Sequence, residues 1–442
     1  MPELSSGRDQ QFGHMRETAR EIFTTALKNA SIESAFARNV HCERRLLRIG
    51  EDLHDLDSYD RLFVVSIGKA AHTMAAALEA RFGSTLEGIV ASSVEPAHQI
   101  RGFRYFHGGH PIPTADSIEA AKAILNSLTA LDATSLAIFM ISGGGSSVVE
   151  KPIDDDILPP DLATTYQALV LSGAPIAEIN AIRKHLSAVK GGRLAQAAYP
   201  AQQVSILVSD VPDDTPDALA SGPTMPDSTS ILDCDRIAAK YDLLEQFPKS
   251  VGDLFRQHAL DETPKSDDPA FVRARWWTVL SNRVAIDEAA VAATRAGFAV
   301  EVDNSCDDWP YDKASTHLLN RLRQLRRSNS RVCLISGGEV TVTVRKGGIG
   351  GRNQQFALAC AEQISGEDIT VLSAGTDGID GNSQAAGAVV DGSTVDRAGG
   401  ADAVRKALST FNAYPLLDEL GGAIFTGPTG NNLRDVRLLL AY

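Results

Sequence analysis

The stretch LAIFMISGGGSS, residues 136–147, joins an apolar run to three consecutive glycines and two serines. A short continuous apolar run that stops at a glycine turn is typical of a buried β-strand, because helices usually need more residues. The stretch therefore predicts a buried strand, Leu136–Ile141, followed by a glycine-rich turn at its carboxyl end.

Two other apolar runs end in a similar way. Arg61–Ile67 stops at Gly68, and Val204–Val208 stops at Ser209 and Asp210. Segments with helical spacing or composition lie between these runs, at residues 70–81, 114–131, 159–171 and 175–186. Strands that alternate with helices in this way indicate parallel βαβ units, so we expect an α/β fold with a mainly parallel sheet. Ligands of such sheets bind at the carboxyl ends of the strands.

The second half of the chain repeats this rhythm. Strands are predicted at residues 276–280, 298–302, 332–335 and 369–374, and the alternation of Val and Thr over Glu339–Arg345 predicts a further strand. Composition changes across residues 221–270, where Pro, Ser and Asp are frequent. We therefore place a domain boundary near Thr229. This boundary gives two α/β domains, residues 15–229 and residues 230–442.

Composition limits the class of protein. The chain has 442 residues and a formal net charge of −14, and it contains no dense run of Lys and Arg. Nucleic-acid-binding proteins usually carry a basic face, so no nucleic-acid partner is expected. The chain shows no hydrophobic signal core, and its apolar runs are far shorter than the roughly 20 residues of a membrane span. Five cysteines without a C-x-x-C pair favour free thiols in a reducing compartment.

These features predict a cytoplasmic enzyme that acts on small molecules, with no membrane partner. The sequence does not fix the oligomeric state, and a homodimer is compatible with it.

The glycine-rich turn has the chemistry of an anion site. Its glycines let the backbone turn tightly and aim several N–H groups outward, and its serines add hydroxyl donors. It is not a Walker A loop, because no G-K-[ST] follows, and a plain strand-to-helix turn is the alternative interpretation. The predicted phosphate-binding residues of this turn are Ser142, Gly143, Gly144, Gly145, Ser146 and Ser147.

Two other strand ends carry a charged residue. Lys69 follows Gly68 where a helix begins, so the helix N-terminus would reinforce its positive charge. A lysine ammonium suits a phosphoryl group that passes from donor to acceptor, although a surface lysine would give the same pattern. Asp210 closes the strand Val204–Val208. Its carboxylate can hold Mg²⁺ or accept a proton from a substrate hydroxyl, and the residues leave this choice open.

Other polar segments are weaker candidates. Asn180 and Lys190 belong to a basic segment that is either a ligand-facing helix tip or a solvated face. Gly350 and Gly351 precede Arg352, whose guanidinium can bind a carboxylate or phosphate through two hydrogen bonds. Asp377, in the loop GTDGIDG at residues 375–381, can hold a metal ion or order the loop.

Taken together, these motifs resemble those of the class II glycerate kinases, the glycerate 2-kinase family. The resemblance covers nearly the whole chain, from about Ile22 to the C-terminus. In this sequence the motifs read SIGKAA (66–71), HPIP (110–113), SGGGSS (142–147), LSGAPI (171–176), NAIRKHLS (180–187), KGGRL (190–194), SDV (209–211), ASGPT (220–224), SGGE (336–339), GGRN (350–353), GTDGIDG (375–381) and TGPTG (426–430).

The resemblance implies phosphorylation of D-glycerate to 2-phosphoglycerate, with ATP as the phosphate donor and Mg²⁺ as the metal. It also implies two α/β domains, one of them Rossmann-like, with the active site in the cleft between them. The essential lysine and arginine of the family fall on Lys69 and Arg352, which are expected to face one crevice. The turn Ser142–Ser147 looks like the phosphate cradle. Asp210 looks like the residue that activates the glycerate hydroxyl or positions Mg²⁺, and Asp377 is a second candidate for the metal.

Three positions depart from the family pattern. Pro212 stands where Gly is common, and Asn431 stands where Thr is frequent. Gln355 follows Gln354 where Glu is usual, which puts a carboxylate role at position 355 in doubt.

Two other function classes compete with the kinase. Members of this family have often carried the name hydroxypyruvate reductase, but a nicotinamide site usually needs a G-x-G-x-x-G segment, and the sequence contains none. A sugar-acid or nucleotide sensor without catalytic activity is the third possibility. Such a sensor would bind ligand without turnover.

Overall fold

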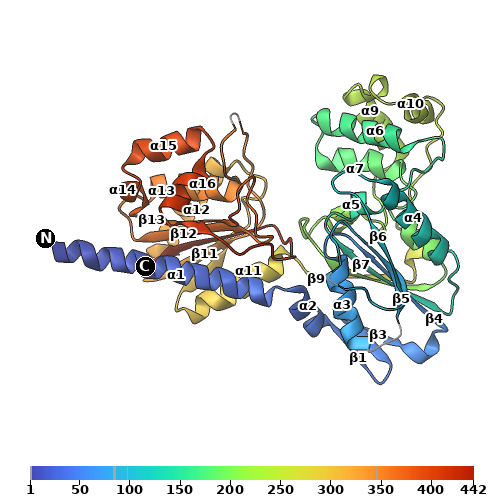
Figure 1. Ribbon diagram of the computed structural model, residues 1–442, viewed down its shortest axis with the longest axis horizontal. Helices are drawn as coiled ribbons and strands as arrows, with labels where there is room; N and C mark the ends of the chain where they lie inside the picture. Colours follow the sequence, from blue (N-terminus) through green and yellow to red (C-terminus); the bar gives the residue numbers. More distant parts are fainter. Residues whose placement is uncertain (1, 83–85, 97, 345–346) are drawn as a thin grey trace. The chain divides into compact units, whose positions relative to one another are not determined.

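A computed structural model describes residues 2–82, 86–96, 98–344 and 347–442 (Figure 1). The chain forms two compact units. The central unit comprises Ile32–Val279, and the terminal unit joins Met1–Ser31 to Leu280–Tyr442. Each unit is described by itself below.

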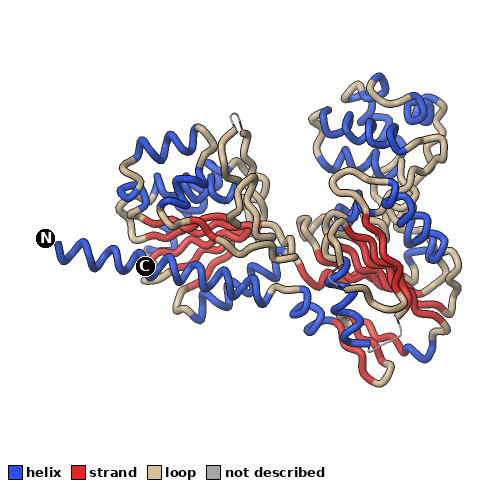
Figure 2. Tube along the Cα trace, viewed as in Figure 1, coloured by secondary structure: helices blue, strands red, loops and turns tan. Residues whose placement is uncertain are grey.

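The central unit is built on a six-stranded sheet with the order β6-β5-β4-β7-β8-β9. Figure 2 shows strands of this unit lying side by side. The pairs β6–β5, β5–β4, β4–β7 and β7–β8 are parallel, as the βαβ pattern predicts. Ile67 lies opposite Ile141, and Ile141 lies opposite Leu207, so the carboxyl ends of three strands stand in line. The strands are β4 (Arg61–Ile67), β5 (Glu87–Ser92), β6 (Phe103–His107), β7 (Ser135–Ser142), β8 (Gln202–Val208) and β9 (Ala274–Leu280).

Helices and a small antiparallel sheet complete the central unit. The small sheet contains β1 (Val40–Glu43), β2 (Leu46–Ile49) and β3 (Asp52–Asp55). The α-helices are α2 (Ile32–Asn39), α3 (Ala71–Phe82), α4 (Ala115–Leu128), α5 (Gly145–Val148), α6 (Pro159–Leu171), α7 (Ile176–His185), α8 (Arg193–Ala198), α9 (Ile231–Lys240) and α10 (Lys249–Arg256). The 3₁₀ helices are η1 (Leu56–Ser58), η2 (Pro216–Ser221), η3 (Leu243–Glu245) and η4 (Pro269–Phe271).

The terminal unit has a mixed sheet with the order β10-β11-β15-β12-β13-β14. Only the pair β10–β11 is parallel among its pairings. The strands are β10 (Ala299–Val302), β11 (Val332–Ser336), β12 (Ile369–Gly375), β13 (Gly387–Asp391), β14 (Ala423–Ile424) and β15 (Asp435–Ala441). The helices are α1 (Pro2–Asn29), α11 (Asn282–Arg295), α12 (Tyr311–Arg326), α13 (Arg352–Gln363), α14 (Thr394–Arg397), α15 (Ala401–Ser409) and α16 (Ala413–Glu419).

The division into units differs from the boundary predicted near Thr229. Helices α9 and α10 follow that position, yet Cys234 and Phe255 are buried in one apolar cluster with Leu169 of α6 and Ile182 of α7. Strand β9 adds the last strand to the central sheet. The change of composition therefore marks a loop inside the central unit, because burial of apolar surface keeps the following helices in the same core.

The strand predicted at Glu339–Arg345 is wrong for the part that the structure describes. Residues 339–344 contain no strand, and only Thr341 pairs, with Pro310, while Arg345 lies outside the described residues. The preceding strand, β11, already has β10 and β15 as neighbours. An alternating sequence needs a free strand edge to pair with, and none is available at β11.

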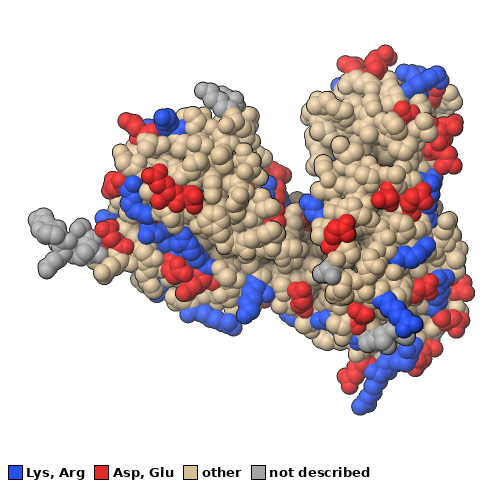
Figure 3. Space-filling model, viewed as in Figure 1, with Lys and Arg blue, Asp and Glu red and all other residues tan. Residues whose placement is uncertain are grey.

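The distribution of charged side chains and the length of the apolar helices agree with what the composition predicts. Figure 3 shows acidic and basic side chains interspersed over the visible faces of the two units. Within the described residues, no helix is long and apolar enough to span a membrane.

Candidate functional site

In the central unit, hydrogen bonds join the turns that follow β4 and β7. The backbone N–H of Lys69 donates to the carbonyl of Gly143 at 2.9 Å. The N–H of Ala70 donates to Oγ of Ser142 at 3.1 Å, and that hydroxyl donates to the carbonyl of Ile67 at 3.2 Å. The sequence-predicted lysine and the glycine-rich turn therefore form one local structure.

Asp210 lies against the same turn. A Cβ atom at Gly143 would clash with Oδ2 of the Asp210 carboxylate, so only glycine permits this close approach. Gly144 has a φ of +81°, and a Cβ atom there would lie 3.1 Å from Cγ of Lys69 and 3.5 Å from Nδ1 of His110. The central unit thus brings together Lys69, Asp210 and the turn Ser142–Ser147, together with His110.

The charge of Lys69 is available to a ligand. Its side chain is exposed, and it forms no ion pair with any residue that the structure describes. Backbone N–H groups of the glycine-rich turn add hydrogen-bond donors to this positive charge, and such a combination suits phosphate. The serine hydroxyls of the turn bond within the protein, Ser142 to Ile67, Ser146 to Ser221 and Ser147 to His110.

Lys190 has surroundings that differ from the predicted ligand contact. Its side chain is 1% exposed, and its ammonium contacts the carboxylate of Glu150, whose side chain is fully buried. Glu150 also accepts hydrogen bonds from Tyr166 at 2.5 Å and from Ser187 at 2.6 Å. Burial is the largest influence on Lys190 and lowers the pKa of its ammonium. Lys190 therefore belongs to a buried polar network.

Other basic residues of α7 are also paired. Lys184 bonds Asp217 at 2.8 Å and Asp227 at 3.2 Å, and the ring of His185 contacts a carboxylate oxygen of Glu262 at 2.8 Å. Asn180, the remaining candidate of this helix, is half-buried. The basic segment consequently contributes mainly to packing within the central unit.

In the terminal unit, Arg352 is the first residue of α13 and is held by two carboxylates. Its Nε and Nη2 donate to Asp435 at 2.6 and 3.0 Å, and Nη2 lies 2.7 Å from Glu339. Burial by itself lowers the pKa of the guanidinium, but the bonds to Asp435 and the charge of Glu339 outweigh it and raise the pKa. Nη1 donates no hydrogen bond to the described residues, so this edge remains for a ligand.

Asp380 caps the same helix. Its carboxylate accepts hydrogen bonds from the backbone N–H groups of Asn353 at 3.1 Å and Gln354 at 2.8 Å. Burial, with a smaller contribution from the charge of Asp435, raises the pKa of Asp380 to about 7. Asp377, three residues earlier in the same loop, is half-buried and accepts a hydrogen bond from the N–H of Ile379 at 3.1 Å.

A cavity of about 780 Å³ opens beside Arg352 within the terminal unit. Gly350 and Gly351 line it, as the sequence predicts for ligand-binding glycines. Its charged described lining residues are Arg352 and the acidic residues Asp308, Glu339, Asp377 and Asp380. The cavity therefore combines one guanidinium with several carboxylates. The guanidinium suits an anionic group of a ligand, and the carboxylates suit a cation bound to that ligand.

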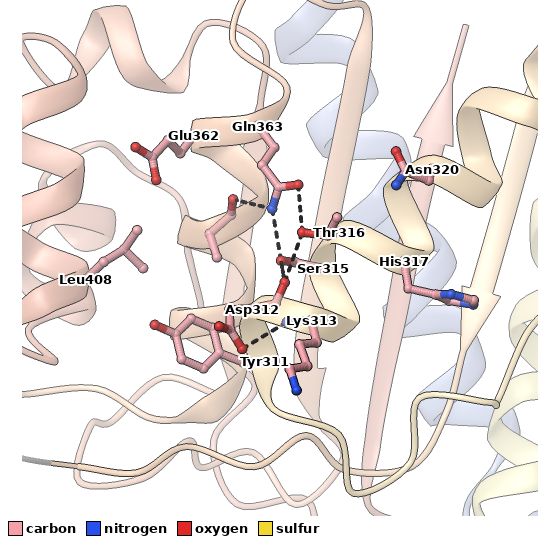
Figure 4. Close-up of a pocket in the computed structure, with 11 residues that line it drawn as sticks. Tyr311, Asp312, Lys313, Ser315, Thr316, His317, Asn320, Glu362, Gln363 and Leu408 are labelled. Atoms are coloured by element: carbon pink, nitrogen blue, oxygen red, sulfur yellow. Dashed lines mark hydrogen bonds between the residues drawn. The ribbon is translucent and has the colours of Figure 1, made fainter.

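A second cavity of the terminal unit, of about 560 Å³, lies at α12 and α13 (Figure 4). The side-chain amide of Gln363 donates to Ser315 at 3.0 Å and accepts from Thr316 at 3.1 Å. None of the predicted site residues lines this cavity. Because it contains none of these residues, it is not the candidate functional site.

Comparison with known proteins places the chain. The family model described as Domain of unknown function (DUF4147) matches residues 18–256, and the model described as MOFRL family matches residues 332–435. A D-glycerate 2-kinase of Thermotoga maritima is 35% identical over 387 residues, covering 85% of this chain and 90% of that protein. A glycerate 2-kinase of Pyrococcus horikoshii is 35% identical over 390 residues, covering 85% and 86%. The chain belongs to the glycerate kinase family.

The fold of this family member agrees with a solved relative. A crystal structure of glycerate kinase from Thermotoga maritima has a TM-score of 0.84 and 31% identity, and the match covers 97% of this chain and all of that one. The α/β fold expected from the sequence is therefore confirmed.

Two residues of this glycerate kinase family member were not among the sequence-predicted site residues. His110 lies in the HPIP motif, and nothing in the sequence indicated that its ring contacts the glycine-rich turn. Asp435 holds Arg352, from which it is separated by 83 residues. Its only sequence signal was its position after the polar loop TGPTGNN (426–432).

Among the predicted site residues, the carboxylates that could bind Mg²⁺ are single side chains and not a cluster. The described residues contain no group of three or more His, Cys, Asp or Glu side chains arranged to hold a metal ion. Mg²⁺ commonly binds through one or two carboxylates and keeps its other positions for water and substrate phosphates. Asp210 and Asp377 fit that mode in this glycerate kinase family member, each within its own unit.

Proposed function

We propose that this chain transfers the terminal phosphoryl group of ATP to the 2-hydroxyl of D-glycerate, giving 2-phosphoglycerate and ADP. The observation that carries the proposal is the exposed ammonium of Lys69 on the glycine-rich turn, with the carboxylate of Asp210 against Gly143. The names of the relatives, glycerate 2-kinase and D-glycerate 2-kinase, support the same reaction.

In this proposal the central unit binds the phosphoryl group. Lys69 and the N–H groups of the turn Ser142–Ser147 neutralise charge on the phosphoryl oxygens, and this charge neutralisation is the main requirement of phosphoryl transfer. Asp210 accepts the proton of the glycerate 2-hydroxyl. The freed oxygen forms the new bond to phosphorus, and the bond from phosphorus to the bridging oxygen of ADP breaks.

In this proposal the terminal unit binds the negatively charged carboxylate of glycerate. The free Nη1 edge of Arg352 suits the glycerate carboxylate, and Asp435 and Glu339 hold the guanidinium in place for it. Mg²⁺, held by Asp210 or Asp377 together with the phosphates of ATP, would neutralise charge on those phosphates. The free thiols of the cysteines agree with a cytoplasmic enzyme.

The test is a coupled assay with ATP, Mg²⁺ and D-glycerate, in which ³¹P NMR identifies the product. The expected product is 2-phosphoglycerate, formed in step with ADP. Formation of 3-phosphoglycerate alone would contradict the assigned hydroxyl. Oxidation of NADH by hydroxypyruvate without ATP, with no ADP formed from D-glycerate, would favour a reductase instead.

Replacement of Gly143 by Ala should lower kcat/KM for this reaction by about 10²-fold, because displacing a reacting group by about 1 Å commonly costs that much. The new methyl group would clash with the Asp210 carboxylate and push it away from the turn. Steady-state kinetics measure the loss. Gly13→Ala is the matched control, because its new methyl group would meet only Arg16, at 3.9 Å. Equal activity of the two variants would argue against a role for Asp210 at this turn.

A further inference from the structure

The segment Gly108–His110 crosses from an outer strand to the glycine-rich turn. It follows β6, which β5 separates from β4. A Cβ atom at Gly108 would clash with the carbonyl oxygen of Val148 in α5, so the glycine lets the two backbones touch. The N–H of Gly109 donates to Oγ of Ser117 at 3.0 Å, which fixes the segment on the start of α4. The following residue, His110, is thereby held beside α5.

The ring of His110 and the side chain of Lys69 both lie beside Gly144. Nδ1 of His110 lies 3.1 Å from Oγ of Ser147 and 3.5 Å from the position of a Cβ atom on Gly144, and Cγ of Lys69 lies 3.1 Å from that same position. The ring is exposed, and Nε2 has no hydrogen-bond partner among the described residues. Burial of part of the ring, followed by the charge of Lys69, lowers the pKa of His110. Burial and the charge of Lys69 therefore favour the uncharged form of the imidazole.

The contact between Ser147 and Nδ1 of His110 is compatible with either tautomer of the ring. The Ser147 hydroxyl has one proton and two acceptors in reach, Nδ1 of His110 at 3.1 Å and the carbonyl of Gly144 at 3.3 Å. When the hydroxyl donates to Nδ1, the proton of the neutral ring is on Nε2. A neutral imidazole in this tautomer presents an N–H donor to whatever binds beside Lys69.

We infer that Nε2–H of His110 is a further phosphate-binding donor, which contacts the phosphate group of ATP bound at Lys69 and the turn Ser142–Ser147. The inference rests on the proposed function for its ligand. Three observations support it. The ring and Lys69 both lie beside Gly144, and Lys69 has no ion-pair partner among the described residues. Ser147 contacts Nδ1, and Nε2 has no described partner. A purely structural histidine would need only the contact with Ser147.

Two substitutions separate these roles. The side-chain amide of Asn reaches about as far as Nδ1 and that of Gln about as far as Nε2, so His110→Asn keeps the contact with Ser147 and His110→Gln keeps the contact with phosphate. His110→Asn should raise KM for ATP by about 10-fold or more, because hydrogen bonds to charged groups contribute at least that much. His110→Gln should recover most of the loss, and KM for D-glycerate should change little in either variant.

His107→Asn is the matched control, because His107 ends the same strand and its ring contacts only the exposed carboxylate of Glu95 among the described ion pairs. It should leave KM for ATP unchanged. A purely structural role of His110 would give the opposite ranking, with His110→Asn near wild type and His110→Gln impaired. That ranking would overturn the inference.

A binding measurement separates this inference from the proposed function. The ¹⁵N resonance of His110 Nε2 in the wild-type protein, assigned with His110→Gln, should shift when ATP or inorganic tripolyphosphate is added. A shift in a protein that fails to phosphorylate D-glycerate would refute the proposed function and support the phosphate contact. An unmoved resonance in an active enzyme would overturn the contact alone, and an unmoved resonance in an inactive protein would overturn both.

Discussion

Replacement of Lys69 by Ala should lower kcat/KM for phosphorylation of D-glycerate by about 10³-fold, because removal of one group that neutralises transition-state charge costs 10²-fold or more. The side chain is exposed and forms no ion pair with described residues, so the fold loses nothing when it is shortened. Exposed substitutions of this kind usually change stability little. The coupled assay measures the kinetic loss, and thermal unfolding checks that the midpoint stays unchanged.

Lys122→Ala provides the matched control for this prediction. Lys122 is also exposed in the central unit, on α4, and its ammonium forms an ion pair with Glu119 three residues earlier. Its replacement should leave both kcat/KM and the unfolding midpoint near their wild-type values. A Lys69→Ala protein with normal kcat/KM and a normal midpoint would contradict the role assigned to Lys69.

Lys69→Arg refines the test. An arginine keeps the positive charge but replaces a compact ammonium with a larger planar group. We expect activity between those of wild type and Lys69→Ala. The ordering would show that charge at this turn, and not only the shape of the side chain, matters for the reaction.

The fold could be predicted where local pattern and tertiary structure agree. Arg61–Ile67 was predicted as a strand and is β4, and the runs at residues 136–141 and 204–208 lie within β7 and β8. In a parallel sheet buried on both sides, each strand is a continuous apolar run, and this signal does not depend on distant residues. Since such strands end at one edge, the same pattern placed Lys69, Asp210 and the glycine-rich turn together.

The errors have a common physical cause, which is dependence on residues far along the chain. Glu339–Arg345 has the alternation of a strand, but β10 and β15 already occupy both edges of β11. The proline-rich change near Thr229 looks like a linker, but Cys234 and Phe255 beyond it join the core of the central unit. Local composition cannot report which surface a later segment will cover.

The candidate site shows the same limit at the level of single side chains. Lys69 and Lys190 each stand next to glycine in the sequence. What distinguishes them is Glu150, which lies 40 residues from Lys190 and contacts its ammonium. A lysine with a buried carboxylate partner is held by the fold, whereas an exposed lysine without one is free to meet a ligand.

Replacement of Lys190 by Met should lower the free energy of unfolding by about 3–5 kcal/mol, because it leaves the Glu150 carboxylate buried without its counter-charge. Urea unfolding of the wild type and the variant measures the difference. The folded fraction of Lys190→Met should keep its KM for ATP, since the ammonium is enclosed by the protein. A large increase in KM with unchanged stability would contradict the structural role and restore the predicted ligand contact.

The double variant Lys190→Met with Glu150→Gln separates the loss of the pair from the loss of packing. Gln keeps oxygen and nitrogen atoms for the bonds with Tyr166 and Ser187, and no charge remains buried. Replacing both members of a buried ion pair by neutral groups of similar volume is often close to neutral in stability. We therefore expect the double variant to regain most of the lost unfolding free energy. Glu150→Gln alone should be destabilised, because it leaves the Lys190 ammonium buried without a negative partner. If the double variant is no more stable than Lys190→Met, the lysine stem and its packing, and not the paired charges, hold this part of the central unit together.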